Sequence, residues 1–405
     1  MLYRIYCRLF QAVMKAAMYL LPWHTPQVIE GAGSVDRLPE DMKKRRIDRV
    51  LVVTGPNMLR RGLLAPTLEN MADLGIEYEV FDRLTADPDD RQVEEGVRLY
   101  HEMNAQGLLL FGGGSPMDCG KAIAARIARP DKSVRKLQGV LKVRARSRVP
   151  MMWAVPTTSG TGSEATMAAV ITDSETHRKK SINDISLIPH VCVLDPELTV
   201  GLPPEITANT GMDALSHAVE AYINGTYNTP LENRMAKAAV KLIYENLYDA
   251  YLDGKNIEKR QNMQRAAFYA GRAFTRGCVG YVHSIGHAVG GFYGVPHGRA
   301  MAILLPHVLK AYGNAAEKRL AELADYCGIS SCEAVDISHK AKTLINWIEN
   351  INRRLAIPAV FDCIMAKDVE IMARWAQREA NPLYPVPVIF NGKQLAEIIN
   401  RAAGK

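Results

Sequence analysis

A change of local pattern near residue 203 constrains the fold of this chain more than any other feature. Before that point, short apolar runs alternate with segments of helical periodicity. After Pro203 and Pro204 strand signals almost vanish, and helical periodicity continues towards the C-terminus, interrupted by the proline-rich segment 381–390. Strands separated by helices typically form a parallel sheet covered by helices. We therefore predict an α/β domain over residues 26–203 and an all-α domain over residues 204–405.

The α/β domain is expected to begin with a strand near residue 28 and to contain five further buried strands. These five are the apolar runs at 49–54, 78–82, 107–111, 151–155 and 191–195. Two of the connecting helices are expected over residues 59–74 and 89–103. At 405 residues, the chain is long enough for two domains with sizeable cores.

Charge and cysteine usage restrict the possible partners. The net charge of +7 is spread over the whole chain, and the densest basic runs, 43–46 and 132–148, form no nucleic-acid-binding motif. The seven cysteines include no CxxC pair, which favours thiols in a reducing compartment over a disulfide framework or a zinc site. We therefore expect a cytoplasmic protein that does not bind nucleic acid.

Residues 1–25 form an amphipathic extension before the α/β domain. A helix over residues 1–21 would place an apolar stripe on one face, made of Leu2, Ile5, Leu9, Val13, Ala16 and Leu20. The segment is too short and too charged to span a membrane, and it lacks a clear signal-peptide cleavage site. We expect the helix to dock on its own domain or on a partner subunit; a helix lying on a membrane surface is the alternative.

Two loops that follow predicted strands are rich in groups that bind phosphates. In the first, Gly112, Gly113 and Gly114 precede Ser115, which is expected to N-cap a helix beginning at Pro116. The free N–H groups at such a helix start attract phosphate. The loop is neither the GxGxxG fingerprint, because Met117 stands at the third glycine, nor a Walker loop.

The second loop, PTTSGTGSEAT at 156–166, offers many hydroxyl and amide donors with little bulk. It follows the apolar run 151–155, as the glycine-rich loop follows 107–111. Two such loops at the same end of adjacent parallel strands form a crevice suited to a nucleotide. The sequence therefore predicts a nucleotide-binding site in the α/β domain.

The helical domain carries five potential metal ligands within residues 211–305. They are Asp213, His217, His283, His287 and His297. The first two are four residues apart, as are His283 and His287, so each pair would share one face of a helix. Histidines with one carboxylate suit Fe²⁺, Zn²⁺ or Ni²⁺ better than Ca²⁺ or Mg²⁺. Spacing does not decide which of the three later histidines complete the site, and His307 is expected to pack or to support a ligand.

Four motifs in this order resemble those of the iron-containing (group III) alcohol dehydrogenases: GGGSPMDCGKA, PTTSGTGSEAT, GMDALSHAVEAY and HSIGHAVGGFYGVPHG. The similarity runs from about residue 28 to at least residue 328. It implies a dehydroquinate-synthase-like fold. It also implies a metal-dependent oxidoreductase that transfers a hydride between NAD or NADP and a small alcohol, aldehyde or ketone, with Fe²⁺, Zn²⁺ or another divalent ion as the metal. We expect a homodimer.

The resemblance assigns roles to individual positions. Asp213, His217, His283 and His297 match the metal ligands, whereas His287 matches a non-ligand histidine near the nicotinamide and becomes the candidate proton relay. The implied cofactor-binding residues are Gly55, Asn57, Gly112, Gly113, Gly114, Ser115, Asp118, Thr157, Thr158 and Lys180.

One departure from the family pattern bears on cofactor choice. Gly55 stands where many members carry an aspartate that faces the adenosine ribose and repels a 2′-phosphate. Arg60 and Arg61 follow closely and are alternatively phosphate contacts or solvated helix residues. We therefore hypothesise that NADP is accepted.

Other interpretations remain open at this point. A glycerol dehydrogenase or a dehydroquinate-synthase-like enzyme would share the fold, and a membrane-associated protein with a vestigial site is a more distant alternative. The four retained ligand positions argue against a metal-free relative.

Overall fold

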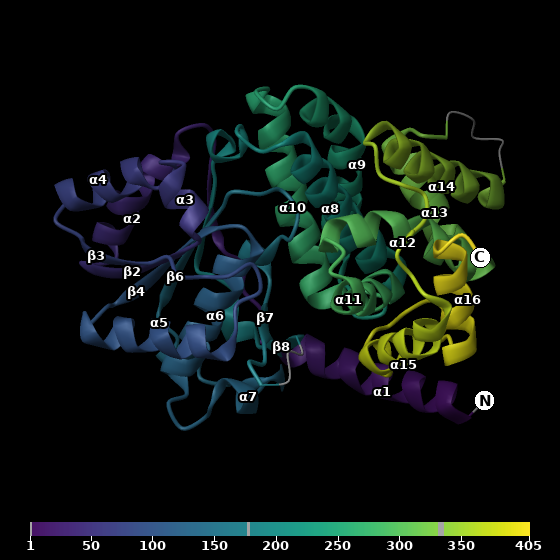
Figure 1. Ribbon diagram of the computed structural model, residues 1–405, viewed down its shortest axis with the longest axis horizontal. Coiled ribbons are helices and arrows are strands. Elements are labelled where there is room, and N and C mark those ends of the chain that lie inside the picture. The colour runs from purple at the N-terminus through teal and green to yellow at the C-terminus, as the bar shows by residue number, and fades with distance from the viewer. Residues whose placement is uncertain (1, 176–178, 331–335) are drawn as a thin grey trace. The chain divides into compact units, whose positions relative to one another are not determined.

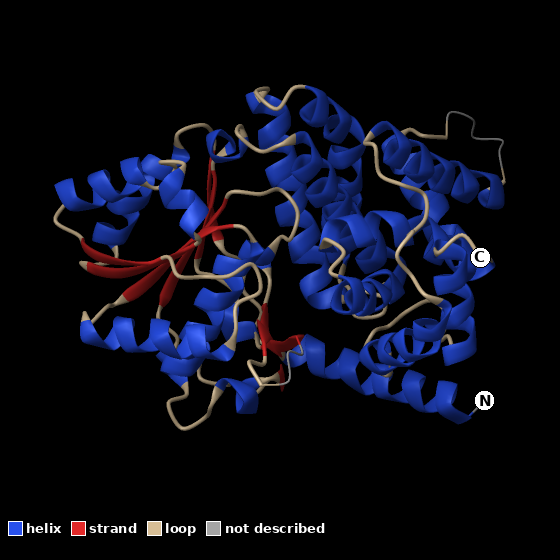
Figure 2. Cartoon of the chain, in the orientation of Figure 1, coloured by secondary structure: helices blue, strands red, loops and turns tan. Residues whose placement is uncertain are grey.

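The computed structural model describes residues 2–175, 179–330 and 336–405, which form two units. The α/β unit comprises residues 22–202 and 255–264. The helical unit comprises residues 1–21, 203–254 and 265–405. Strands belong to the first unit, and the described part of the second is helical (Figure 2).

A six-stranded parallel sheet forms the centre of the α/β unit. Its strand order is β1-β9-β6-β4-β2-β3. The strands are β1 (Gln27–Glu30), β2 (Arg49–Thr54), β3 (Glu77–Phe81), β4 (Gly107–Gly112), β6 (Met151–Pro156) and β9 (Val191–Leu194). The predicted parallel sheet is confirmed, and β4 and β6, which precede the two candidate loops, are neighbours.

Helices cover both faces of this sheet (Figure 1). One face carries α5 (Asp90–Glu102) and α6 (Gly114–Ala128), and the other carries α2 (Leu38–Lys44) and α4 (Ala65–Asp73). Alternate residues of β2 belong to the two cores, Leu51 and Val53 to one and Val50 and Val52 to the other. Burial on both faces is why this strand is continuously apolar rather than alternating.

Outside the cofactor loops, the α/β unit differs from the predictions in two places. The expected helix over 59–74 is divided into α3 (Pro56–Arg60) and α4, because Gly62 between them adopts a left-handed conformation with φ of +69°. A second sheet was not predicted. It has the order β5-β8-β7, formed by Gly139–Val140, Lys179–Asn183 and Ala168–Thr172, with a short helix α7 (Val134–Leu137) before it. β5 has two residues and β8 is mostly polar, so neither carries an apolar run, whereas β7 is apolar from residue 168 to residue 171 and was missed.

The helical unit is built around α8, which is buried along most of its length. Its helices are α1 (Leu2–Leu20), α8 (Pro204–Asn224), α9 (Pro230–Leu252), the later part of α10 (Ile257–Gly277), α11 (Tyr281–Tyr293), α12 (His297–Tyr312), α13 (Asn314–Cys327), α14 (Ile337–Arg354), α15 (Val369–Ala380) and α16 (Gly392–Ala402). Within the described residues, no helix combines the length and hydrophobicity needed to cross a membrane.

The N-terminal helix α1 docks on the helical unit through the face opposite to its apolar stripe. Its buried residues are Cys7, Gln11 and Met18. The apolar stripe points away from the unit, and its end residues Leu2 and Leu20 are 84% and 86% exposed. The helix thus docks on its own chain, one of the two expected partners, but it does so without burying the apolar stripe. The docked face is polar at Gln11 because that side chain supplies hydrogen bonds to backbone carbonyls of residues 382 and 384.

Candidate functional site

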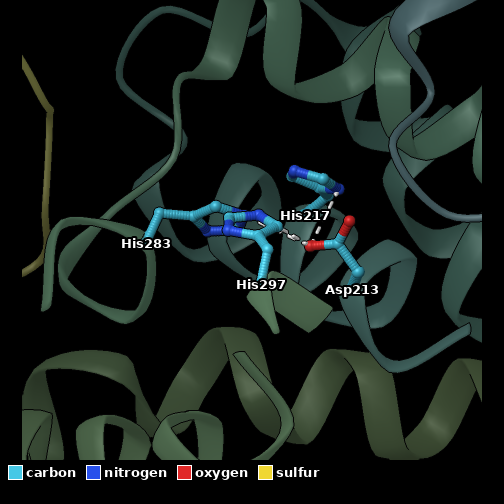
Figure 3. A group of neighbouring side chains, drawn as sticks. All are labelled: Asp213, His217, His283 and His297. Atoms are coloured by element: carbon cyan, nitrogen blue, oxygen red, sulfur yellow. Dashed lines mark ion pairs between the residues drawn. The ribbon is translucent and has the colours of Figure 1, made fainter. Parts of the chain in front are cut away.

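Four of the five predicted ligand candidates meet in the helical unit (Figure 3). Asp213 and His217 lie one turn apart on α8, His283 lies in the first turn of α11, and His297 begins α12. Each offers a donor atom, and these atoms all lie within 4.8 Å of one another. The i,i+4 spacing on α8 places the first two side chains together, whereas the packing of α11 and α12 brings the other two to them.

The Asp213 carboxylate is central to this cluster. Its Oδ1 lies 3.3 Å from Nε2 of His297, 3.7 Å from Nε2 of His283 and 3.9 Å from Nδ1 of His217. Burial alone would raise the pKa of Asp213, but the surrounding imidazoles of His217, His297 and His283 hold that pKa well below its usual value. The carboxylate is therefore ionised and makes the cluster attractive to a cation.

The donor set fits a divalent transition metal. Asp213 Oδ1 and His283 Nε2 are buried and form no hydrogen bond within the described part of the chain. Buried polar atoms are normally satisfied, so a pair left without hydrogen bonds at one point indicates a ligand. Three imidazoles with one carboxylate are donors that Fe²⁺ and Zn²⁺ accept.

Glu220 supports His283 from behind and was not predicted from the sequence. Its Oε2 lies 2.6 Å from Nδ1 of His283, and the carboxylate also accepts hydrogen bonds from the N–H groups of Gly280 and Val282. Burial would lower the pKa of His283, but Asp213 and Glu220 raise it to about 9. A carboxylate on the rear nitrogen of a histidine fixes the ring and directs the other nitrogen towards the metal.

His287 stands beside the cluster without joining it. Its ring stacks on that of His297 with centroids 5.3 Å apart. Its Nδ1 lies 2.7 Å from Oε1 of Glu379 on α15, and the side chain is 42% exposed. Among the candidates left open by spacing, the structure thus separates four residues whose donor atoms lie together from His287, which lies beside them.

The two candidate cofactor loops lie together at the carboxyl ends of β4 and β6. Thr157 N donates to Gly112 O at 3.0 Å. A Cβ at Gly114 would lie 3.1 Å from Cγ2 of Thr161, closer than most Cβ contacts, so glycine suits the close packing of the loops there. Thr157 is buried and Thr158 is partly exposed. The loops form one surface with backbone N–H groups at the start of α6.

The start of α6 differs from the prediction by two residues. The helix begins at Gly114 with Gly113 as its N-cap, and Ser115 lies in the first turn. The Ser115 hydroxyl donates to Ala86 O instead of capping the helix. The extended backbone of Gly113, with φ of −84° and ψ of −155°, turns the chain into the helix earlier than a serine cap would.

Asp118 and Lys121 of α6 hold the second loop in place. Asp118 accepts hydrogen bonds from Ser163 Oγ at 3.0 Å and Val170 N at 3.1 Å. Lys121 is fully buried, and its Nζ donates to backbone and hydroxyl oxygens of Ser163 and Thr166 and to Ala168 O. The carboxylate and the ammonium group therefore connect the first loop's helix to the second loop.

The remaining predicted cofactor residues are more exposed. Gly55 caps α3 with an extended backbone, and a Cβ built there meets no atom within 4 Å. Asn57 Oδ1 accepts a hydrogen bond from Arg60, and Arg61 donates to Gly201 O. Lys180 is exposed on β8, paired across the ladder with Ile171.

The sequence did not predict the roles of three supporting residues, Glu220, Lys121 and Glu379, for different reasons. Glu220 follows His217 at a spacing that places it on the same face of α8, so the i, i+4, i+7 pattern of Asp213, His217 and Glu220 is a local signal for it. Lys121 fell within the first motif but resembled an ordinary helix residue. Glu379 is 92 residues from His287, and no local pattern connects them.

Comparison with known proteins agrees with this geometry. Residues 25–196 match the sequence model of the iron-containing alcohol dehydrogenases, and residues 207–403 match that of the C-terminal part of the Fe-containing alcohol dehydrogenase family.

Individual relatives cover most of the chain. It is 35% identical over 379 residues to the NAD-dependent methanol dehydrogenase of Bacillus methanolicus, covering 93% of this chain and 98% of that protein. It is 34% identical over 331 residues to the NADPH-dependent butanol dehydrogenase of Clostridium saccharobutylicum, covering 81% and 82%. A crystal structure of 1,3-propanediol oxidoreductase superposes with a TM-score of 0.89 at 32% identity, covering 95% of this chain and all of that one. The chain therefore belongs to the iron-containing alcohol dehydrogenase family and is an oxidoreductase that acts on small alcohols.

Proposed function

We propose that the enzyme interconverts small primary alcohols and their aldehydes with NAD or NADP, using Fe²⁺ held by Asp213, His217, His283 and His297. The observation that carries this proposal is the cluster of three imidazoles around one buried, ionised carboxylate. The cofactor would bind on the paired loops at the ends of β4 and β6, where glycines and N–H groups accept a pyrophosphate.

The chemistry divides between the bound groups and the residues of the chain. A bound divalent ion supplies Lewis acidity towards the substrate oxygen, and a nicotinamide exchanges the hydride. Asp213 and the three ligand histidines fix the position of the ion, and Glu220 fixes the ring of His283. His287 is accessible and one turn from His283, so it would carry the proton that leaves or enters the substrate oxygen.

The test is a panel of short alcohols and aldehydes, assayed with NAD(H) and NADP(H) on protein reconstituted with Fe²⁺ and, in parallel, with Zn²⁺. We expect turnover of primary alcohols or aldehydes that is lost on chelation and restored by Fe²⁺. Equal turnover in the chelated protein would refute the metal-dependent function, and higher activity with Zn²⁺ would refute the choice of iron.

We further propose that NADP is accepted, and a substitution at Gly55 tests this. Gly55→Asp is expected to lower kcat/KM for NADPH by about tenfold or more while changing kcat/KM for NADH little, because the added carboxylate would repel a 2′-phosphate. The open space around Gly55 means that the fold tolerates the side chain. The measurement is the ratio of kcat/KM for the two cofactors.

Gly55→Asn is the matched control, since it has the same size without the charge. It should leave the NADPH to NADH ratio near that of the wild-type enzyme. A wild-type enzyme with a strong NADH preference, or an unchanged ratio in Gly55→Asp, would contradict the proposal.

The proposed role of His287 gives a separate expectation. His287→Ala should keep its full complement of metal but lose about 10²- to 10⁴-fold in kcat, which is the usual contribution of acid–base catalysis. Metal per chain and kcat are measured on the same sample. His307→Ala is the control. The His307 imidazole forms a hydrogen bond with Ala359 O outside the cluster, so this variant should retain activity. Loss of metal from His287→Ala would show that the ligand assignment is wrong.

A further inference from the structure

Glu379 fixes the orientation of His287. The two residues lie on α15 and α11, which pack against each other, and Oε1 of Glu379 lies 2.7 Å from Nδ1 of His287. A carboxylate accepts hydrogen bonds and does not donate them when ionised, so the shared proton resides on Nδ1. The lone pair of the neutral ring is then on Nε2, the nitrogen on the opposite side of the ring.

Tyr384 in turn fixes Glu379. The Tyr384 hydroxyl donates to the same Oε1 at 3.2 Å, so this oxygen accepts from both Tyr384 and His287. Tyr384 belongs to residues 381–387, the segment between α15 and α16 that we call the strap. The orientation of the Glu379 carboxylate thus depends on where the strap holds the tyrosine.

The N-terminal helix α1 holds the strap. Gln11 is 1% exposed, and its Nε2 donates to Pro382 O at 3.0 Å and to Tyr384 O at 2.9 Å. Arg8 donates to Gln11 Oε1 at 2.8 Å and to Pro387 O at 2.9 Å. The side-chain amide of Gln11 therefore donates both of its N–H groups to carbonyls of the strap. These two hydrogen bonds fix the backbone on either side of Leu383.

We propose that Glu379 is a positioning residue for His287 and that α1 is its remote support, through the chain Gln11, Tyr384, Glu379 and His287. The inference rests on the proposed proton transfer by His287. It gives a function to residues that precede the segments matching the family, which begin at residue 25. In this arrangement α1 helps to fix the ring orientation and the tautomer of His287.

The experiment is a double-mutant cycle on metal-loaded enzyme, with kcat, KM, metal content and Tm measured for each variant. Glu379→Ala should lower kcat about tenfold or more, part of the 10²- to 10⁴-fold range of acid–base catalysis, with metal content and cofactor KM unchanged. In a His287→Ala background the same substitution should have no further effect on kcat, because a positioning residue acts through the group that it positions. Glu370→Ala, an exposed residue at the start of α15, is the matched control and should retain wild-type kcat.

The remote part is tested with Gln11→Met, which keeps the volume of the side chain and removes both donors. We expect a loss of about threefold to tenfold in kcat, the range through which substitutions in a contact network act on a distant site. The loss should disappear in the Glu379→Ala background. Lys15→Ala, exposed on the same helix, is the control.

The outcomes separate this inference from the proposed function. If His287→Ala itself keeps full kcat, the proposed proton transfer is wrong and the positioning role falls with it. If His287→Ala is slow but Glu379→Ala is not, or if their losses multiply in the double variant, Glu379 does not act through His287. If Gln11→Met lowers Tm without changing kcat, α1 stabilises the fold and does not support the site.

Discussion

Asp213→Ala is expected to lose its bound divalent metal and about 10³-fold or more of its turnover. Asp213 Oδ1 lies within 3.9 Å of a nitrogen of each of the three proposed ligand histidines, and its side chain is buried. Without this carboxylate, the ion would lose one of its four proposed protein ligands and the one that is negatively charged. A 10³-fold loss corresponds to about 4 kcal/mol, within the several kcal/mol that Lewis-acid catalysis supplies. Metal per chain is measured by elemental analysis after dialysis, and turnover on the same protein.

Asp213→Asn separates charge from shape, since it keeps the volume of the side chain. It should also lose metal, because an amide oxygen is a weaker donor than a carboxylate. Glu205→Gln removes a carboxylate from an exposed position at the start of α8 and should retain both metal and turnover. A folded Asp213→Ala protein that keeps one metal per chain would place the ion elsewhere.

Lys121→Met is expected to destabilise the α/β unit by about 3–5 kcal/mol, the usual cost of removing one partner of a buried charge group. The Lys121 ammonium is fully buried and donates to oxygens of Ser163, Thr166 and Ala168. Burial lowers its pKa to about 8, with Asp118 and Glu164 opposing that effect. Methionine fills about the same volume but leaves these acceptors without the Lys121 donor and removes the buried cation that stabilises both carboxylates.

The same substitution should weaken cofactor binding, because Lys121 fastens the loop at 156–166 to α6. We expect a lower urea midpoint of unfolding and a higher KM for the nicotinamide cofactor, each measured against the wild-type enzyme. Lys43→Met removes an exposed lysine that pairs with Asp48 and should change stability by less than about 1 kcal/mol. If Lys121→Met has the same urea midpoint of unfolding as the wild-type enzyme and an unchanged cofactor KM, this buried cation supports neither the loop nor the fold.

Local pattern predicted the regular elements well where burial was complete. The run 49–54 is β2 to the residue, since a strand covered on both faces is apolar throughout. The pattern failed where conformation depended on a single backbone angle or on neighbours in space. The helix expected over 59–74 breaks at Gly62, and the polar strand β8 pairs with β7 although its own sequence carries no apolar run.

The N-terminal helix shows a different limit. Its apolar periodicity correctly indicates an amphipathic helix, and periodicity alone favours burial of the apolar stripe. The structure buries the opposite face instead, because Gln11 satisfies carbonyl groups of the strap. Nothing in residues 1–21 identifies those acceptors, which lie more than 370 residues away.

The sequence by itself determined the strands of the six-stranded sheet, the two loops suited to a cofactor, and a set of five metal-ligand candidates, because each of these is recorded in short local patterns. The tertiary structure decided which donors share one point in space. It joined Asp213 and His217 to His283 and His297, placed Glu220 behind His283, and turned His287 towards Glu379. These groupings depend on how helices distant in the sequence pack, and helix packing is fixed by side chains that no local pattern records.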